Sequence, residues 1–494
     1  MAIATIELGH HLADDLPGLV LDWKATPVPE PSMVVANSPL AAELGIDPDW
    51  LLSDEGAATL AGNAVPDSAR PVAMAYAGHQ FGNYSPRLGD GRALLLGEVV
   101  GADGSVRDLH LKGTGRTPFA RGGDGRAMLS SMLREFLHCE AMHALGIPTT
   151  RALAVVTTGE AVQRTRVEPG AVLARVASSH LRVGTVEYAR WLDDGEHLAA
   201  LVEHAIARHC PDAADAERPA LALLAHTVEV QADLIARWMN VGFIHGVMNT
   251  DNTTLSGETI DFGPCAYMDR FDPETVYSSI DHAGRYAYGN QPAVAQWNLT
   301  RMAEALLPVI DEDRDTAVAL ATEVLEGFVL RYQTSWASTM ATKLGLSSGG
   351  PQDHGRSDLF DGLLTLMAAA RTDYTSTFRL LAQSLRGKDA PLRASFPDHV
   401  VELDDWLTAW SDALGDADRT ATADAMDAVN PIYVPRNHLV EAALDAAAVD
   451  GDLTVFQTLL DHITHPFDER PGSEAMAGPA PDDFADSYVT FCGT

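Results

Sequence analysis

The stretch HGVMNTDNTTLSGETIDFG at residues 245–263 decides the fold predicted for this chain. Its first part ends in Asp251 and Asn252, and an Asp-Phe-Gly sequence begins nine positions after Asn252, at Asp261. Residues 254–260 between them have the pattern of a short hairpin with Ser-Gly at its turn. Such a hairpin would bring Asn252 and Asp261 to one point, and Mg²⁺ prefers amide and carboxylate oxygens. The stretch therefore predicts a divalent-cation site, with a turn capped by Asn and Asp side chains as the alternative.

The order of these residues is similar to that in protein kinases, where a catalytic loop ending in a metal-binding Asn precedes Asp-Phe-Gly. A kinase loop reads His-Arg-Asp, whereas the third residue here is Val247. The usual base for phosphoryl transfer is therefore missing. Asp251 is the nearest carboxylate that could accept a proton from a hydroxyl group. Its alternative roles are to support a metal ligand from behind or to cap the loop.

Lys112 and Glu135 form a second candidate pair. Lys112 ends a strand-like run at 109–112, and Glu135 follows 23 positions later on a helix expected over 126–145. Kinases pair a strand Lys with a helix Glu to hold the nucleotide phosphates. The chain has only four lysines, so one within His-Leu-Lys-Gly-Thr-Gly is not expected to serve as a surface solubiliser. A structural ion pair without a ligand is the alternative.

Two glycine-rich loops and two arginines add phosphate-binding chemistry. LGDGR at 88–92 precedes a strand, and GGDGR at 122–126 is expected to open the helix. Glycines let backbone N–H groups approach phosphate oxygens, and a helix N-terminus favours negative charge. Arg175 and Arg182 carry forked guanidinium groups that suit terminal phosphates, with surface solvation as their alternative. His79 is expected to be a packed or capping residue.

The charge balance excludes some partners. The chain has 69 acidic against 34 basic residues, a formal net charge of −35. Such a surface repels nucleic acid and anionic membrane, so neither is expected as a partner. A chain this acidic must gather positive charge locally to hold a polyphosphate, and several arginines cluster between positions 87 and 182. The N-terminus lacks a signal-peptide pattern, no apolar run reaches the length of a membrane span, and the four cysteines are widely spaced, so a cytoplasmic protein is expected.

With these residues in hand, the chain resembles the selenoprotein O family, also called the YdiU family, of kinase-like protein adenylyltransferases. The match covers most of the chain. It rests on the strings YAGHQFG at 76–82, LGDGR at 88–92, LKGTGRTPF at 111–119, GDGR at 123–126, HGVMNTDN at 245–252, DFGP at 261–264, and GNQP at 289–292 with WNL at 297–299.

The resemblance implies an α+β fold of the bilobal protein-kinase kind, with a smaller sheet-rich lobe and a larger helical lobe. Placed on this sequence, the parts are an N-terminal extension (1–70), the sheet-rich N-lobe with the nucleotide-binding loops (71–186), the helical C-lobe with the catalytic and metal-binding loops (187–464) and a flexible C-terminal tail (465–494).

The resemblance also implies a reaction. In this family ATP is held in reverse relative to kinases, so that AMP passes to Ser, Thr or Tyr hydroxyls of other proteins and pyrophosphate is released. The alternatives are a kinase-like phosphotransferase, a protein uridylyltransferase and a catalytically silent ATP-binding scaffold. The sequence does not identify the modified proteins or the oligomeric state.

Carried over motif by motif, Asp251 would be the proton acceptor, and Asn252 and Asp261 would bind Mg²⁺ or Mn²⁺. The nucleotide would be held by Lys112 paired with Glu135, by Arg175 and Arg182 at the terminal phosphates, and by Gly89, Gly91, Arg92, Asp124 and Gly125. Many members carry Cys or selenocysteine near the C-terminus, and Cys492 occupies that place. A redox-switch disulfide is conceivable there, although spacing identifies no partner.

Overall fold

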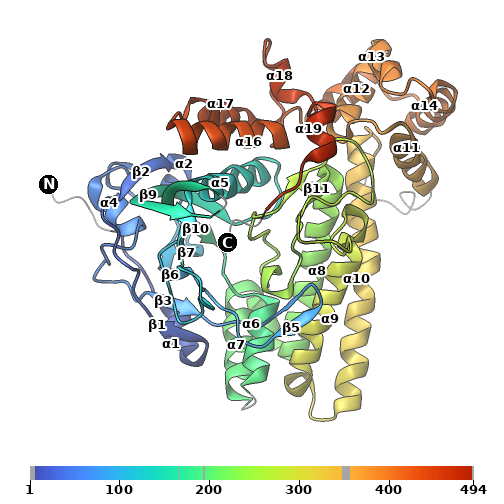
Figure 1. Ribbon diagram of the computed structural model, residues 1–494. Helices are drawn as coiled ribbons and strands as arrows, with labels where there is room; N and C mark the ends of the chain where they lie inside the picture. The colour runs from blue at the N-terminus through green and yellow to red at the C-terminus, as the bar shows by residue number, and fades with distance from the viewer. Residues whose placement is uncertain (1–5, 165, 193–194, 348–355, 492–494) are drawn as a thin grey trace.

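A computed structural model of the chain describes residues 6–164, 166–192, 195–347 and 356–491. Its largest sheet has eight strands in the order β1-β3-β6-β7-β10-β9-β2, with β8 paired to β10, and every pairing is antiparallel (Figure 1). The strands are β1 (Val20–Asp22), β2 (Ser32–Ala36), β3 (Val72–Met74), β6 (Ala93–Val100), β7 (Val106–Lys112), β8 (Ala127–Met128), β9 (Arg151–Gln163) and β10 (Val167–Ala177).

The register of β7 and β10 places three cationic or imidazole side chains on one face. Lys112 pairs with Leu173, and His110 pairs with Arg175. Residues two apart on a strand, and residues directly opposite each other, point to the same side of a sheet. Lys112, His110 and Arg175 therefore share a face. Helix α5 (Leu129–Ala144) packs against β9 and β10 through buried apolar residues.

Helices dominate the chain after β10, as the sequence predicts (Figure 1). Pro219 opens α8 in the first helical turn, and Gly242, with φ of 71°, ends it in the left-handed conformation. Helices α8, α9 and α10 pack side by side. The helices of this part are α6 (Val183–Trp191), α7 (Glu196–His209), α8 (Pro219–Val241), α9 (Gln291–Ile310), α10 (Arg314–Lys343), α11 (Ser357–Ala370), α12 (Tyr374–Leu385), α13 (Ala390–Ala394), α14 (Val400–Leu414), α15 (Arg419–Asp427), α16 (Asn437–Asp445), α17 (Thr454–Ile463), α18 (Glu474–Ala477) and α19 (Asp482–Ser487).

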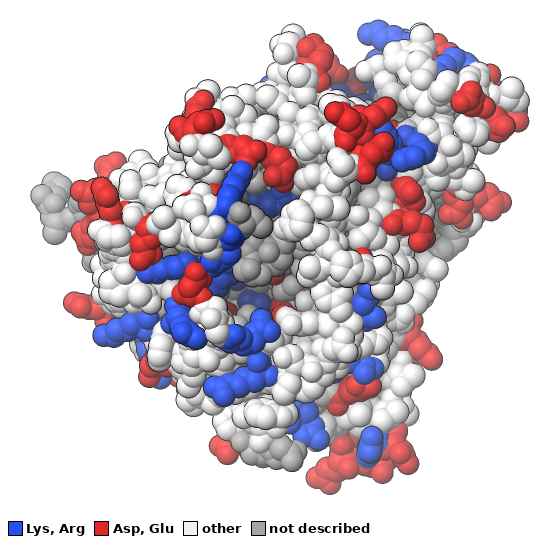
Figure 2. All heavy atoms as spheres, viewed as in Figure 1, with Lys and Arg blue, Asp and Glu red and all other residues white. Residues whose placement is uncertain are grey.

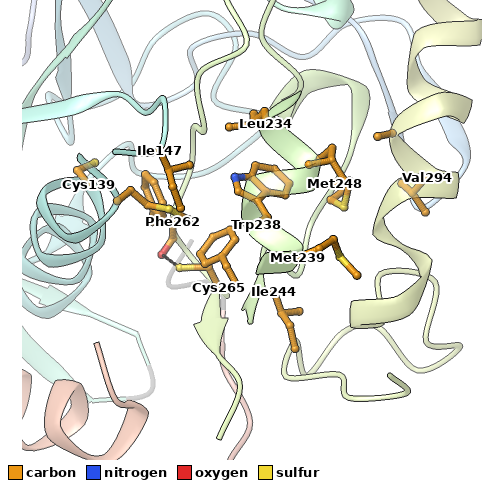
Figure 3. Close-up of a cluster of buried hydrophobic side chains, with 14 of the residues drawn as sticks. Cys139, Ile147, Leu234, Trp238, Met239, Ile244, Met248, Phe262, Cys265 and Val294 are labelled. Carbon is orange, nitrogen blue, oxygen red and sulfur yellow. Dashed lines mark hydrogen bonds between the residues drawn. The ribbon is translucent and has the colours of Figure 1, made fainter. Parts of the chain in front are cut away.

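One buried apolar cluster joins the sheet and α5 to the helices that follow. Figure 3 shows part of it, in which Phe262 of Asp-Phe-Gly lies among side chains of α5 and α8 such as Cys139 and Trp238. A second cluster fills the space between the other face of the sheet and the short helices near the N-terminus: α2 (Ser38–Glu43), α3 (Pro48–Leu51) and α4 (Asp54–Leu60). The segment that carries Asp261 is thus anchored in the main core.

Several elements differ from the sequence prediction. The hairpin expected over 254–260 is wrong, because Thr254 pairs with Arg182 and Thr259 pairs with Thr149, rather than with each other. Alternation predicts extended backbone but does not identify its partner. The helix expected over 358–385 is broken by Arg371, whose φ is 51°, and the one expected over 436–462 is broken near Gly451.

The described end of the chain is tied to the segment after Asp-Phe-Gly. Arg270 forms ion pairs with Asp482 and with Asp486, the latter at 2.7 Å. Thr490 Oγ1 donates a hydrogen bond of 2.7 Å to the Pro264 carbonyl oxygen. Cys492, the expected redox residue, lies outside the described residues.

The mixed α/β fold with an antiparallel sheet is confirmed. The division into two kinase-like lobes, with its boundaries, stays a prediction. Within the described ranges, no helix combines the length and the apolar character that crossing a bilayer demands.

Candidate active site

A cavity of about 430 Å³ gathers the predicted site residues. Lys and Arg side chains surround a hollow near the middle of the face shown in Figure 2. Glu135 alone among the predicted residues is not in the cavity wall, although it reaches the site through Lys112. The predicted residues in the wall are Gly89, Gly91, Arg92, Lys112, Asp124, Gly125, Arg175, Arg182, Asp251, Asn252 and Asp261.

Lys112 links three elements at the cavity. Its ammonium group binds Glu135 of α5 and donates to Asp261 Oδ1 at 3.0 Å. Burial opposes ionisation of Asp261, but the charges of Lys112, Arg175 and Arg92 outweigh it, and the pKa of Asp261 lies well below its usual value. Asp261 is therefore a carboxylate at neutral pH. Its φ of 67° is unusual for a residue other than glycine and marks a strained backbone held by its surroundings.

Arg175 and Arg182 are buried, with 3% and 6% of their surfaces exposed, which rules out simple surface solvation. Arg182 Nη1 donates to the Asp251 carbonyl oxygen at 2.9 Å, and its guanidinium lies 4.4 Å from the Tyr76 ring centre. Both Nε atoms are buried without a hydrogen-bond partner among the described residues. A buried donor without a partner is costly, so an anionic ligand would stabilise both arginines.

His110 and Asp90 support these arginines from behind. Arg175 Nη2 lies 3.3 Å from His110 Nδ1, and His110 Nε2 lies 3.1 Å from Asp90 Oδ2. Because arginine can only donate, Nδ1 must accept, and the ring proton sits on Nε2 and points to Asp90. Burial and the two arginines lower the pKa of His110 despite Asp90, so the ring stays neutral. Sequence reasoning missed both residues, although strand parity with Lys112 could have identified His110.

The loop before Asp-Phe-Gly holds Asp251 on a short 3₁₀ helix, Thr250–Asn252. Asp251 Oδ2 accepts a hydrogen bond of 3.1 Å from Gln80 Nε2, while Oδ1 is buried without a partner among the described residues. Burial raises the pKa of Asp251 to about 6, although Arg182 and Gln80 act in the opposite direction. The group can thus accept a proton near neutral pH.

Asn252 and Asp261 fit a metal that is shared with a ligand. Asn252 Nδ2 donates to the Val247 carbonyl oxygen at 3.0 Å, which leaves its side-chain oxygen for a cation. In the part of the chain that the structure describes, no group of three or more His, Cys, Asp or Glu side chains is arranged to hold a metal by itself. Mg²⁺ commonly takes one or two carboxylates and completes its shell with phosphates and water. One carboxylate and one amide oxygen suit that arrangement.

The glycine-rich loops pack closely at the cavity. Gly89 has φ of 120°, and a Cβ there would lie 2.6 Å from the Phe119 ring and 2.8 Å from the Met74 carbonyl oxygen. Gly125 has φ of 74°, and its Cβ would lie 2.1 Å from the Gly115 backbone. Only glycine fits either position.

The second loop differs from the prediction in two ways. It does not open a helix, because β8 intervenes and α5 begins at Leu129. The helix dipole therefore does not act at this loop. Asp124 borders the cavity, but its carboxylate binds Arg164 at 2.7 Å and accepts from the Arg126 N–H at 3.0 Å. Asp124 thus orders the loop.

Known proteins resemble this chain over nearly its whole length. The family described as "Protein adenylyltransferase SelO" matches residues 7–464. Proteins named "Protein nucleotidyltransferase YdiU" are 55% identical in Pseudarthrobacter chlorophenolicus over 100% of this chain and 99% of the relative. In Mycolicibacterium smegmatis the identity is 56% over 99% of each chain, and in Cereibacter sphaeroides 54% over 99% of this chain and 100% of the relative.

The site and these relatives define the class: the chain is an enzyme, a protein nucleotidyltransferase, whose substrates are a nucleotide and other proteins. The family follows from the match to residues 7–464. This chain belongs to the SelO family of protein adenylyltransferases, and the resemblance read from the sequence is confirmed.

Proposed function

We propose that this enzyme transfers AMP from ATP to Ser, Thr or Tyr hydroxyl groups of other proteins and releases pyrophosphate. The observation that supports it best is the meeting of Lys112, Arg175, Arg182 and Asp261 with Asp251 in one cavity, whereas Val247 occupies the place of the kinase base. The buried arginines favour a triphosphate whose terminal phosphates lie deep in the cavity. The α-phosphate would then face the acceptor.

In this reaction Asp251 Oδ1 takes the proton of the acceptor hydroxyl. The hydroxyl oxygen attacks the α-phosphorus, the bond from that phosphorus to the oxygen bridging the β-phosphorus breaks, and pyrophosphate leaves with the bond electrons. Lys112, Arg175 and Arg182 stabilise the charge that grows on the leaving group. Asn252 and Asp261 would hold Mg²⁺ or Mn²⁺, which would neutralise phosphate charge when bound.

We extend the proposal to the molecule. Residues 71–186 and 187–464 form the two lobes of a kinase-like fold, an interpretation supported by the change from sheet to helices after β10. The reaction takes place in the cytoplasm, where the free thiols of Cys139, Cys210 and Cys265 would stay reduced.

The test uses ATP labelled separately at the α- and γ-phosphates, with soluble bacterial proteins as acceptors. The proposal expects protein-bound label from α-labelled ATP alone, and expects Asp251→Asn and Asp261→Ala to abolish it. Label from γ-labelled ATP alone would instead identify a phosphotransferase. A stronger signal from α-labelled UTP would identify uridylyl transfer, and no label with intact ATP binding would identify a scaffold.

A further inference from the structure

A small hairpin next to the cavity has no role in the proposed chemistry so far. Strands β4 (Gly78–Gln80) and β5 (Asn83–Ser85) pair only with each other among the described strands. They come from the YAGHQFG string, which the sequence singled out without a function. The hairpin lies against the 3₁₀ helix that carries Asp251.

Three consecutive hairpin residues hold three residues of the catalytic loop. The His79 N–H donates to Thr250 Oγ1 at 2.7 Å, and the Phe81 N–H donates to Asn249 Oδ1 at 3.2 Å. Between them, Gln80 Nε2 donates to Asp251 Oδ2 at 3.1 Å. Every contact joins segments about 170 residues apart in sequence, so none arises from local folding.

The two segments meet without spare room. A Cβ at Gly78 would lie 2.6 Å from Asp251 Oδ1. Phe81 has φ of 51°, and its N–H is also bound by the Tyr286 hydroxyl at 3.1 Å. A non-glycine residue holds this conformation only where its surroundings impose it. The hairpin is therefore fixed relative to the loop.

Glu187 of α6 fastens both segments from the other side. Its Oε1 lies 2.5 Å from His79 Nδ1, and its Oε2 accepts from Thr250 Oγ1 at 2.6 Å. Thr250 is fully buried and Glu187 nearly so. One carboxylate thus binds the hairpin and the loop together, and a short buried hydrogen bond to a charged or shared group is among the stronger ones.

These contacts leave Asp251 with one unengaged oxygen. Arg182 holds its carbonyl oxygen and Gln80 holds Oδ2, while Oδ1 has no partner among the described residues. We propose that Gln80 is a positioning residue of the transfer reaction, whose carboxamide orients Asp251 so that Oδ1 takes the acceptor's proton, while the His79–Glu187–Thr250 group fixes the loop. The inference rests on the proposed function in naming Asp251 as the proton acceptor.

Orientation of a general base has a large effect on rate. General-base catalysis contributes roughly 10²–10⁴-fold, and a misplacement of about 1 Å removes much of such a contribution. Loss of the Gln80 contact is therefore expected to lower kcat by about 10–100-fold. It should leave KM for ATP unchanged, because Gln80 contacts no residue proposed to hold the phosphates or the metal.

The decisive variant is Gln80→Met, which keeps the side-chain length but removes the donor. Its matched control is Gln296→Ala on α9, where a part-buried carboxamide donates to the Leu325 carbonyl oxygen away from the cavity. We expect Gln80→Met to lose kcat as above, with KM for ATP and nucleotide affinity within about twofold of wild type. A kcat equal to that of Gln296→Ala, or a loss matched by weaker ATP binding, would overturn the proposal.

A second measurement does not depend on the reaction. Hydrogen exchange of peptides covering residues 245–253 should quicken at least tenfold in Glu187→Ala and stay near wild type in Gln80→Met. Unchanged exchange in Glu187→Ala would refute the clamp whatever the enzyme transfers. If wild type carries γ-label instead of α-label, the proposed function fails. The effect of Gln80→Met on kcat still tests how Asp251 is positioned.

Discussion

Asp251 shows how opposing effects set the chemistry of a single residue. Burial disfavours its charge, whereas Arg182 and the Gln80 amide favour it, and burial wins by raising the pKa to about 6. An exposed aspartate would be a weaker base, since its pKa is about 3.9. Asp251 therefore combines a mostly ionised state at neutral pH with a proton affinity closer to that of a useful base.

The pH dependence of the reaction follows from this value. The base must be ionised, so kcat should fall as the pH drops through about 6, by up to tenfold per unit below it. We expect this limb in steady-state rates measured from pH 5 to 8 at saturating ATP. Nucleotide affinity measured at the same pH values is the control. A rate that stays constant down to pH 5 would contradict the role of Asp251.

The buried arginines are expected to control nucleotide affinity. Replacing Arg175 by alanine removes a charged donor, and hydrogen bonds to charged groups are worth about 1.5–3 kcal/mol, or roughly 10–100-fold in Kd. Calorimetric titration with ATP measures this, with Lys388→Ala on the exposed surface as the matched control. Equal affinities for the two variants would show that phosphate does not reach Arg175.

Residue contacts differ in how far the sequence reveals them. The Lys112–Glu135 ion pair could be predicted, because a strand Lys and a helix Glu at a kinase-like spacing specify it. The Gln80–Asp251 contact could not, since it joins residues 171 positions apart through side chains. His110 lies between these cases, because alternation along β7 places it on the face of Lys112.

Among the elements, the loop at Gly89 is built around the absence of a side chain. Gly89→Ala would force a Cβ against Phe119 and the Met74 carbonyl at φ of 120°. Strain of this kind costs about 1–3 kcal/mol. Gly122→Ala is the control, because φ there is 96° but nothing lies within 4 Å of the new Cβ. We expect Gly89→Ala to lower both Tm and ATP affinity more than Gly122→Ala, and equal losses would refute the packing argument.

Helix α6 carries a carboxyl group that makes stability depend on pH. Burial raises the pKa of Glu187 to about 7, despite the hydrogen bond from Thr250. Between its ordinary value of 4.5 and 7, the folded protein therefore binds more protons than the unfolded chain, and stability falls as pH rises. The effect is at most about 3 kcal/mol by linkage.

Glu187→Gln removes this titration while keeping an acceptor for Thr250. The difference in Tm, variant minus wild type, should therefore rise by a few degrees between pH 5 and pH 8. Thermal melts at the two pH values measure it. A difference that does not change with pH would show that Glu187 keeps an ordinary pKa in the folded protein.

Element boundaries were predictable where a local signal ends them. Pro219 and Gly242 bound α8 as helix rules require. The segment 254–260 was not, because its two halves bind Arg182 and Thr149 instead of each other, and no local pattern names a partner so distant. The same limit hid the hairpin at 78–85, whose short strands gain their stability from the catalytic loop.

At the scale of the whole molecule, positive charge is concentrated where the overall charge is strongly negative. The net charge is −35, and composition alone predicted that cations must gather at any polyphosphate site. The cavity wall bears this out with Arg92, Lys112, Arg121, Arg126, Arg164, Arg175 and Arg182. Composition could not predict that Arg121 would be exposed at the edge while Arg175 and Arg182 are buried.

This difference in depth predicts how salt acts on nucleotide binding. Exposed charges are screened within about 10 Å at 0.1 M salt, whereas buried ones are screened much less. Raising KCl from 50 to 500 mM at fixed metal concentration should therefore weaken ATP binding several-fold in wild type, mainly through edge residues such as Arg121. Arg121→Gln should bind ATP slightly less tightly at low salt and show a shallower dependence of Kd on salt. Arg175→Gln should bind far less tightly at every salt concentration, with a slope near that of wild type. Equal slopes for wild type and Arg121→Gln would mean that edge charge does not contribute, and the attraction of nucleotide to this acidic protein would then rest on the buried arginines and Lys112 alone.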